Sequence, residues 1–365
     1  ADTGELIPIQ ELAQRKTQDP IPVFGLDESW RMVVQPMTNV FSSGRKMVYA
    51  LKTRSGRLIK ASANHPFRTP LRWQRLDQLQ VGESIALPQQ LKPHKPSDTL
   101  SRDELLLLAH LLGDGCTLPN QPVHYTSGDL ENINLVAQAA ARLFGIKPRI
   151  VPQQNWWHVY LPSPYRLTHG KHNPIIAWLQ RLGTDAYHAW EKRIPGPVFT
   201  CPEAEIAFFL RHLWSTDGNI SWKRLAGRKP AAAIYYASTS ELLASQVQHL
   251  LLRLGIHSTL KKVLQPGYRP IFHVHIQGCR PQLDFLRTVG CVGARAKIIP
   301  ELIAALEEIV PHATLGALPR VLWKEMIEPV KVAAGVSWRA VASGLDMQYC
   351  GSALFKAGIS SERLG

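Results

Sequence analysis

The stretches LLAHLLGDG at residues 107–115 and LRHLWSTDG at residues 210–218 are two copies of one pattern. Each is an apolar run of helical character that ends in a small residue, an aspartate and a glycine. Asp114 and Asp217 are 103 residues apart (217 − 114). Two similar tetrapeptides follow, KRIP and KIIP, in which Lys192 and Lys297 are 105 residues apart (297 − 192). Two acids and two bases at nearly one period predict a duplicated domain whose copies build one pseudo-symmetric site.

The segments after each copy repeat as well. Residues 123–146 and 234–256 each read as a short aromatic strand, a polar turn and a helix that ends at Gly145 or Gly255, where a C-terminal cap is expected. Two strand-like stretches and a short helix complete each copy. A period near 105 residues is too long for a solenoid repeat, so the pattern predicts a duplicated α+β subdomain.

This order of motifs resembles the LAGLIDADG homing endonucleases over about residues 103–300. The resemblance implies two motif helices packed side by side and saddle-shaped antiparallel sheets that lie in the major groove of DNA. Ala109, Gly113 and Ser215 are the small residues expected to let the helices approach closely. Neither copy spells the full motif, because Leu112 and Ser215 replace an earlier aspartate. That position packs the helices, so the departure leaves the predicted cleavage chemistry in place.

The resemblance also implies the chemistry of the site. Phosphodiester hydrolysis needs charge stabilisation on the attacking and leaving oxygens. Asp114 and Asp217 are the expected ligands of Mg²⁺ or Mn²⁺. Lys192 and Lys297 would stabilise developing charge or organise the attacking water. An isolated Asp-Gly is usually a turn, and an isolated lysine beside proline is usually solvated, but recurrence in register favours a site. Two alternatives stay open: a DNA-binding protein of this fold that does not cut, and a splicing scaffold with a decayed nuclease.

The charge distribution predicts a polyanionic partner. The chain has a formal net charge of +14, and between residues 221 and 300 only Glu241 and Asp284 oppose twelve basic residues. We expect double-stranded DNA, an intein-less copy of the host gene, to be bound by a monomer. His273 and His275 share a strand face and are expected to pack or touch DNA rather than bind zinc. The sequence contains no long apolar run that would indicate a membrane partner. The predicted DNA contacts are Lys223, Arg224, Arg228, Lys229, Lys261, Lys262 and Arg269.

The N-terminal module has a different pattern, with short strand-like runs and turn signals that predict an all-β fold. It resembles the Hint-type splicing domain of inteins, and Ser62-Ala63-Asn64-His65 matches that family's Thr-x-x-His motif with Ser62 in the Thr place. The resemblance implies that His65 donates a hydrogen bond to the scissile N-terminal peptide bond. It also implies that the flanking segments, the exteins, belong to the host protein. The alternative is a histidine at a strand end, satisfied by the backbone. The whole order is similar to inteins of bacterial replicative DNA helicases.

The expected organisation is multi-domain. It comprises an N-terminal splicing module at 1–92, a linker at 93–103, LAGLIDADG repeats at 104–200 and 201–303, and a helical accessory region at 304–365. In this last region VSWRAVASGL and MQYCGSALFKAG could form a helix-turn-helix-like pair or a plain helical support. The resemblance also implies an initial Cys or Ser and a terminal His-Asn, whereas this sequence begins with Ala1 and ends with Gly365. We therefore expect a fragment that does not splice alone. Five scattered cysteines favour reduced thiols in the cytoplasm.

Overall fold

The computed structural model describes residues 2–15, 19–97, 99–184, 187–224, 231–309 and 321–344. These residues fall into two compact units. The first holds described residues from 2–43, 53–57 and 89–309, and the second holds those from 44–52, 58–88 and 321–344. Among the described residues, every helix is too short or too polar to cross a lipid bilayer.

The predicted duplication is confirmed in the first unit, where two repeats have the same order of elements. In each, a motif helix leads into a four-stranded antiparallel sheet, a helix lies between its second and third strands, and a short helix follows the sheet. The first repeat comprises α2 (Arg102–Asp114), β7 (Gly115–Cys116), β8 (His124–Ser127), α3 (Leu130–Phe144), β9 (Arg149–Pro152), β10 (Trp157–Tyr160) and α4 (Pro174–Arg181). The second comprises α6 (Glu203–Asp217), β11 (Gly218–Lys223), β12 (Ala231–Ser238), α7 (Glu241–Arg253), β13 (Thr259–Val263), β14 (Ile271–Ile276) and α8 (Cys279–Thr288).

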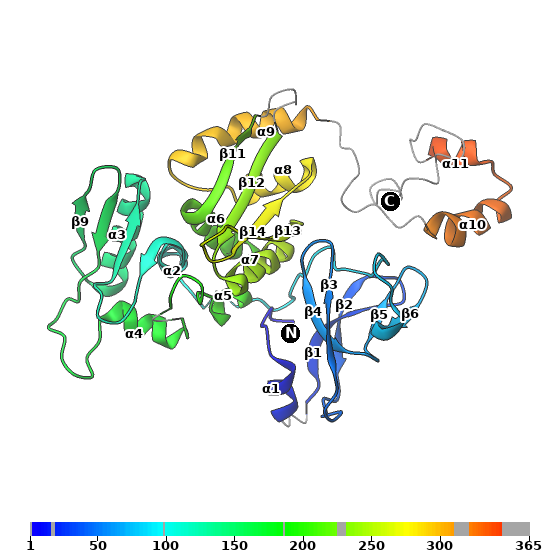
Figure 1. Cartoon of the computed structure of the whole chain (residues 1–365), viewed down its shortest axis with the longest axis horizontal. Helices are drawn as coiled ribbons and strands as arrows, with labels where there is room; N and C mark the ends of the chain where they lie inside the picture. The colour runs from blue at the N-terminus through cyan, green and yellow to red at the C-terminus, as the bar shows by residue number, and fades with distance from the viewer. Residues whose placement is uncertain are drawn as a thin grey trace. The chain divides into compact units, whose positions relative to one another are not determined.

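The two sheets have equivalent strand orders, β7-β8-β10-β9 and β11-β12-β14-β13. In Figure 1 the strands β11 and β12 run side by side in the second sheet. Short elements follow or join the repeats: α5 (Gly196–Thr200), η2 (Ala294–Ile298) and α9 (Ile299–Glu307). The α+β class predicted for this part of the chain is therefore correct.

Local sequence signals set the helix ends. Ser101 and Glu104 form a capping box at the start of α2, and the side chain of Ser240 caps α7. Gly145 follows α3 with a φ of 61°, the left-handed conformation expected at a C-terminal cap. These bonds satisfy backbone groups that have no partner within a helix.

The motif helices α2 and α6 pack closely against each other in one apolar core that spans both repeats. Gly113 makes the approach possible, because a Cβ added there would meet the side chain of Thr216 at less than 3.0 Å. Gly113 was predicted to act in this way, and the residue that it meets on α6 is Thr216. The Oγ of Ser215 instead donates to the carbonyl of Arg211 and accepts from the amide of Val292.

Three polar residues form a network inside this core. The Nδ1 of His110 lies 3.0 Å from the hydroxyl of Tyr125, and its Nε2 lies 3.2 Å from the Nδ1 of His212. Burial lowers the pKa of both imidazoles, that of His212 to about 4, so both rings are neutral at neutral pH. The network satisfies polar groups that are out of reach of water.

The rest of the first unit is the N-terminal segment, with α1 (Ile9–Gln14) and the hairpin of β1 (Ile21–Leu26) and β2 (Met32–Met37). Its start lies against the second repeat. The guanidinium of Arg253 is buried and donates to the carbonyls of Phe199 and Cys201, and a Cβ at Gly4 would collide with it.

The second unit contains short antiparallel hairpins and a helical segment. The hairpins are formed by β3 (Val48–Lys52) with β4 (Leu58–Ser62), and by β5 (Pro66–Arg68) with β6 (Trp73–Arg75) before η1 (Leu76–Gln78). The helical segment consists of η3 (Trp323–Ile327), α10 (Glu328–Ala333) and α11 (Trp338–Gly344) around buried Trp323 and Ala342. The first predicted accessory helix is present as α11, and the second lies outside the described residues.

Candidate active site and DNA-facing surface

Asp114 and Asp217 end the two motif helices. Both residues expose much of their surface, yet enough protein surrounds their carboxyls for burial to be the largest influence on their pKa. Burial and the neighbouring Asp217 raise the pKa of Asp114 to about 7. Burial also raises the pKa of Asp217. Two carboxyls at one site that resist ionisation favour the arrival of a cation.

Lys192 holds the end of the first motif helix. Its Nζ lies 2.7 Å from the carbonyl oxygen of Gly113, 3.2 Å from that of Gly115 and 3.4 Å from that of Leu111. Carbonyls in the last turn of a helix have no partner within it, and the helix dipole favours a cation there. Burial lowers the pKa of Lys192, whereas Asp217 and Asp114 raise it. Lys192 therefore fixes the backbone on both sides of Asp114.

Arg295, in η2, makes the same contacts in the second repeat. Its Nη1 lies 2.6 Å from the carbonyl oxygen of Thr216, 2.8 Å from that of Gly218 and 3.4 Å from that of Ser215. Lys192 follows its acceptors Gly113 and Gly115 by 79 and 77 residues, and Arg295 follows Thr216 and Gly218 by the same numbers. Arg295 is thus the spatial equivalent of Lys192.

Lys297 lies two residues beyond Arg295 in the same 3-10 helix and is exposed. The structure brings Asp114, Asp217 and Lys192 together as predicted by sequence, and it puts Arg295 at the position expected for Lys297. The tetrapeptides KRIP and KIIP align their prolines, but the second copy has two more residues between the cation and the proline. The exact 103-residue period shared with the aspartates was the signal that could have identified Arg295.

Two buried tyrosines flank the site in equivalent places. Gly115 pairs with Tyr125 across β7 and β8, and Gly218 pairs with Tyr236 across β11 and β12. Neither tyrosine exposes any surface, and burial raises the pKa of both hydroxyls. They were not predicted as site residues. The available signal was that each tyrosine stands third in the matching stretches that begin at Val123 and Ile234.

The carboxylate pair fits a hard divalent cation. Within the described ranges, three or more His, Cys, Asp or Glu residues nowhere gather into a metal-binding group. Mg²⁺ needs no such cage, because it is commonly held by one or two carboxylates together with substrate phosphates and water. Asp114 and Asp217 supply two exposed carboxylates whose pKa values are raised mainly by burial, which Lys192 and Arg295 offset only in part. Mn²⁺ accepts the same oxygen donors.

The second sheet has one face covered by helices and one open face. Along β12 and β14 the residues alternate between buried and partly exposed, which places Tyr235, His273 and His275 on the open face. Tyr235 stacks on His273 with ring centroids 5.1 Å apart. Burial, followed by His273, Lys261 and Lys223, lowers the pKa of His275 to about 4. The open face therefore joins neutral aromatic rings to cations.

The predicted DNA contacts separate into groups. Lys261 pairs with His273 and Lys223 with Ala231, so both belong to the open face. Lys262 pairs with buried Phe272 and lies 5.9 Å from its ring centroid, which puts it on the opposite face. Arg269 stacks over the ring of Trp190 at 3.8 Å, and Arg224 is exposed after β11. Arg228 and Lys229 lie outside the described residues.

The first sheet presents an open face of similar chemistry, whose residues were not predicted from the sequence. His124 and His158 lie in T-shaped contact, 5.4 Å apart, and the Nδ1 of His158 lies 2.9 Å from the Oγ1 of Thr126. The guanidinium of Arg149 lies 4.8 Å from the ring centroid of Tyr160. The strand period of two was the signal for this face, because these residues alternate with buried Tyr125 and Val159.

His65 of the second unit is exposed in the turn between β4 and β5. Its amide donates to the carbonyl of Ser62, its carbonyl accepts from the amide of Leu76, and its ring lies 5.2 Å from that of Phe67. The hydroxyl of Ser62 donates to Asn64. The tight turn over Ser62–His65 thus turns the imidazole toward solvent, while the backbone is satisfied locally.

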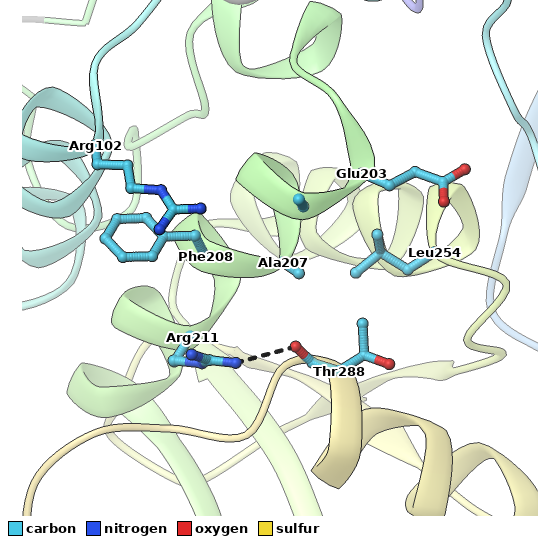
Figure 2. Close-up of a pocket in the computed structure, with 8 residues that line it drawn as sticks. Arg102, Glu203, Ala207, Phe208, Arg211, Leu254 and Thr288 are labelled. Atoms are coloured by element: carbon cyan, nitrogen blue, oxygen red, sulfur yellow. Dashed lines mark hydrogen bonds between the residues drawn. The ribbon is translucent and has the colours of Figure 1, made fainter.

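A cavity of about 510 Å³ lies at the opposite end of the motif helices. In Figure 2 Arg102 extends beside Phe208, with its guanidinium 5.1 Å from the ring centroid, and Arg211 donates to the carbonyl of Thr288. Arg102 begins α2 and Asp114 ends it, which separates them by about 18 Å at the helical rise. The cavity therefore does not belong to the carboxylate site.

Comparison with known families finds a match in the second repeat. Residues 204–290, which span most of the second repeat, match the family model described as a LAGLIDADG-like domain. This match begins in α6, which carries Asp217, and ends after α8.

The chain spans less than half of the length of the curated helicases that it matches most fully. Over 374 residues the chain is 40% identical to the replicative DNA helicase DnaB of Synechocystis sp. strain PCC 6803, covering 100% of the chain and 42% of that helicase. A DnaB mini-intein structure is 41% identical over 25% of the chain and 56% of its own, with a TM-score of 0.23. The endonuclease I-DmoI in complex with DNA and Mn is 16% identical over 52% of the chain and 96% of its own, with a TM-score of 0.35. The resemblances to LAGLIDADG endonucleases and to helicase inteins are confirmed.

Proposed function

We propose that the chain is an intein-encoded homing endonuclease that cuts double-stranded DNA with a divalent cation and is joined to a protein-splicing module. One observation carries the proposal. The two closely packed motif helices end in Asp114 and Asp217, and equivalent cations, Lys192 and Arg295, hold the two helix ends. A pseudo-symmetric pair of this kind suits two scissile phosphates, one on each strand of a duplex.

The residues would divide the chemistry as follows. Asp114 and Asp217 would hold Mg²⁺ or Mn²⁺ between the protein and the phosphates. When bound, the ion stabilises negative charge on the phosphate and lowers the pKa of a bound water. Because both carboxyls have raised pKa values, deprotonation and ion binding are linked: the ion compensates charge that burial disfavours.

Lys192 and Arg295 would act mainly as positioning residues. Each donates to carbonyls on both sides of an aspartate, so each fixes the direction in which that carboxylate leaves its helix. Their positive charge also lies next to the phosphates that we expect there. We assign the second basic role to Arg295 and place Lys297, which is exposed in η2, among the residues near the DNA backbone.

The open faces of the two sheets are the proposed DNA-binding surface. Lys223 and Lys261 would neutralise phosphates, while Tyr235, His273 and His275 would meet base edges or sugars. The proposed target is an intein-less copy of the host gene, and the host exteins are the proposed partners of the splicing module.

The test is cleavage of a supercoiled plasmid that carries an intein-less helicase gene, in the presence of Mg²⁺ or Mn²⁺. We expect linear product from the wild-type protein. Asp114→Asn and Asp217→Asn should abolish that product and retain DNA binding, because the carboxylates serve the ion rather than the grip on the backbone. Binding of this plasmid by wild-type protein without cleavage would favour the alternative of a non-cutting DNA-binding protein.

His65 supports the splicing role of the N-terminal module. Its exposed ring at the Ser62–His65 turn can reach a peptide placed against the strand end. The experiment is to supply a Cys-initiated strand and a closing strand ending in His-Asn, and to follow ligation of flanking sequences. His65→Ala should block the first acyl shift, and Asn64→Ala serves as a neighbouring control. Equal splicing with Ala at position 65 would leave the histidine with only a structural role.

A further inference from the structure

The turn that joins β3 to β4 lies against the second repeat. The carbonyl of Ser55 accepts from the amide of Leu260 in β13 at 2.9 Å and from the Nε2 of Gln248 in α7 at 2.9 Å. Arg57 donates in return to the carbonyl of Gln248 at 3.3 Å. The turn, Thr53–Arg57, therefore belongs to the same compact unit as the LAGLIDADG repeats, although it lies more than 190 residues earlier in the chain than Gln248.

Gly56 makes this contact possible. It has a φ of +83°, and a Cβ built on it would collide with the backbone carbonyl of Leu260, which no side-chain movement can relieve. Gly44 offers a natural comparison in the preceding connection. Its φ is +81°, but no atom lies within 4 Å of a Cβ built there. The two glycines share a positive φ, but a Cβ would meet a neighbouring strand at Gly56 and not at Gly44.

The strand that receives the turn is the edge of the DNA-facing sheet. In the order β11-β12-β14-β13, β13 has a neighbour strand on one side only. The turn satisfies the amide of Leu260, a group that an open edge would leave to water or to another chain. Covering an edge is a sufficient structural reason for a turn, but it does not require a basic residue.

Two cations flank this hydrogen bond. Lys261 follows Leu260 directly and belongs to the open face of the sheet. Arg54 precedes Ser55 directly and is exposed. Each cation is one peptide unit, about 3.8 Å between Cα atoms, from the bonded pair Ser55–Leu260. Adjacent phosphates on a DNA strand recur on a similar scale of several ångströms, so one backbone can meet both side chains.

We propose that the turn Thr53–Arg57 is part of the DNA-binding surface, and that Arg54 contacts a backbone phosphate beside the one bound at Lys261. This inference rests on the proposed function of the sheet. It assigns to a turn of the N-terminal module a share of the grip on duplex DNA, and it makes the docking at Gly56 a condition for that grip.

The test measures how binding depends on salt, using a labelled duplex that spans the junction of an intein-less helicase gene, with Ca²⁺ in place of Mg²⁺. Arg54→Ala should reduce the slope of log K against log salt by about 0.9, the value for one lost phosphate contact. Arg72→Ala, which removes an exposed arginine from the turn between β5 and β6, is the matched control and should leave the slope unchanged.

Gly56→Ala should reduce the slope as much as Arg54→Ala, and the double variant should lose no more than either, because both disable one contact. Gly44→Ala controls for the strain of a side chain at positive φ and should bind normally. A normal slope for Arg54→Ala together with a reduced slope for Lys261→Ala would overturn this inference and leave the proposed function standing. Normal slopes for both Arg54→Ala and Lys261→Ala would mean that DNA does not bind at this sheet, and would overturn both this inference and the proposed DNA-binding surface. Thermal melting of each variant shows that the comparison is made on folded protein.

Discussion

Arg295 occupies in the second repeat the position that Lys192 occupies in the first. Each cation donates to two carbonyls that precede it by 79 and 77 residues, and each pair of carbonyls brackets a motif aspartate. The pseudo-symmetry of the site therefore extends from the carboxylates to the groups that hold them. The two halves differ in chemistry, because a lysine is a point charge on a flexible stem and an arginine is a planar fork that stays protonated.

The first prediction separates Arg295 from Lys297. Arg295→Ala should slow cleavage by roughly 100-fold, the usual scale for removing one positioned charge-stabilising group, while DNA affinity changes little. The accumulation of nicked plasmid would be expected, because the first half-site keeps Lys192. Arg295→Lys should recover part of the rate, since the charge is kept and the fork is lost. If Lys297→Ala were the slower of the two alanine variants, the assignment would have to be reversed.

The second prediction concerns the closest approach of the motif helices. Gly113→Ala should destabilise the protein by about 2 kcal/mol through overpacking against Thr216, and should displace the adjacent carboxylate enough to impair cutting. Replacing Thr216 by glycine in the same protein should restore part of the stability, although glycine within a helix costs up to about 1 kcal/mol. Chemical denaturation measures both effects, and Thr216→Gly alone is the control. Unchanged stability of Gly113→Ala would mean that the helices can separate freely.

The third prediction follows from the raised pKa of Asp114. A group whose pKa is higher in the folded than in the unfolded protein contributes stability at low pH and loses it as the pH rises through the folded value. In EDTA, wild-type protein should therefore lose stability between about pH 4 and pH 7 relative to Asp114→Asn. Screening at these exposed residues limits the difference to about 1 to 2 kcal/mol.

Thermal melts of both proteins across this pH range provide the measurement. Asp217→Asn should give a difference of the same sign, because the two carboxyls titrate as a pair. A gap between wild-type and Asp114→Asn that stayed constant with pH would show that folding does not raise the pKa of Asp114.

The fourth prediction distinguishes the two faces of β13. Lys261→Ala should reduce the salt dependence of DNA binding by about 0.9 in slope, because Lys261 lies on the open face. Lys262→Ala is the matched control, since it removes the same charge one residue away, on the side of buried Phe272. Equal effects of the two substitutions would indicate that DNA binds across the edge of the sheet rather than on its face.

The sequence alone determined the features that depend on local signals and on the period of the duplication. Asp114 and Asp217 could be located because each ends an apolar helix in a repeated motif, and the helix boundaries followed from caps such as Ser101 and Gly145. Lys192 could be located because the tetrapeptide KRIP that it begins has a similar copy, KIIP, about one period later. These features need only contacts between near neighbours, or one constant offset between two copies.

Tertiary structure decided the features that depend on register. Arg295 rather than Lys297 contacts the end of the second motif helix. Which of the two residues does so depends on the path of the chain after α8, and the alignment of the two prolines does not define that path. Lys261 and Lys262 point to opposite faces, because a strand alternates with a period of two and the register sets which residue is inside. The contact of Gly56 with Leu260 joins segments about 200 residues apart, so the local sequence of neither segment could predict it.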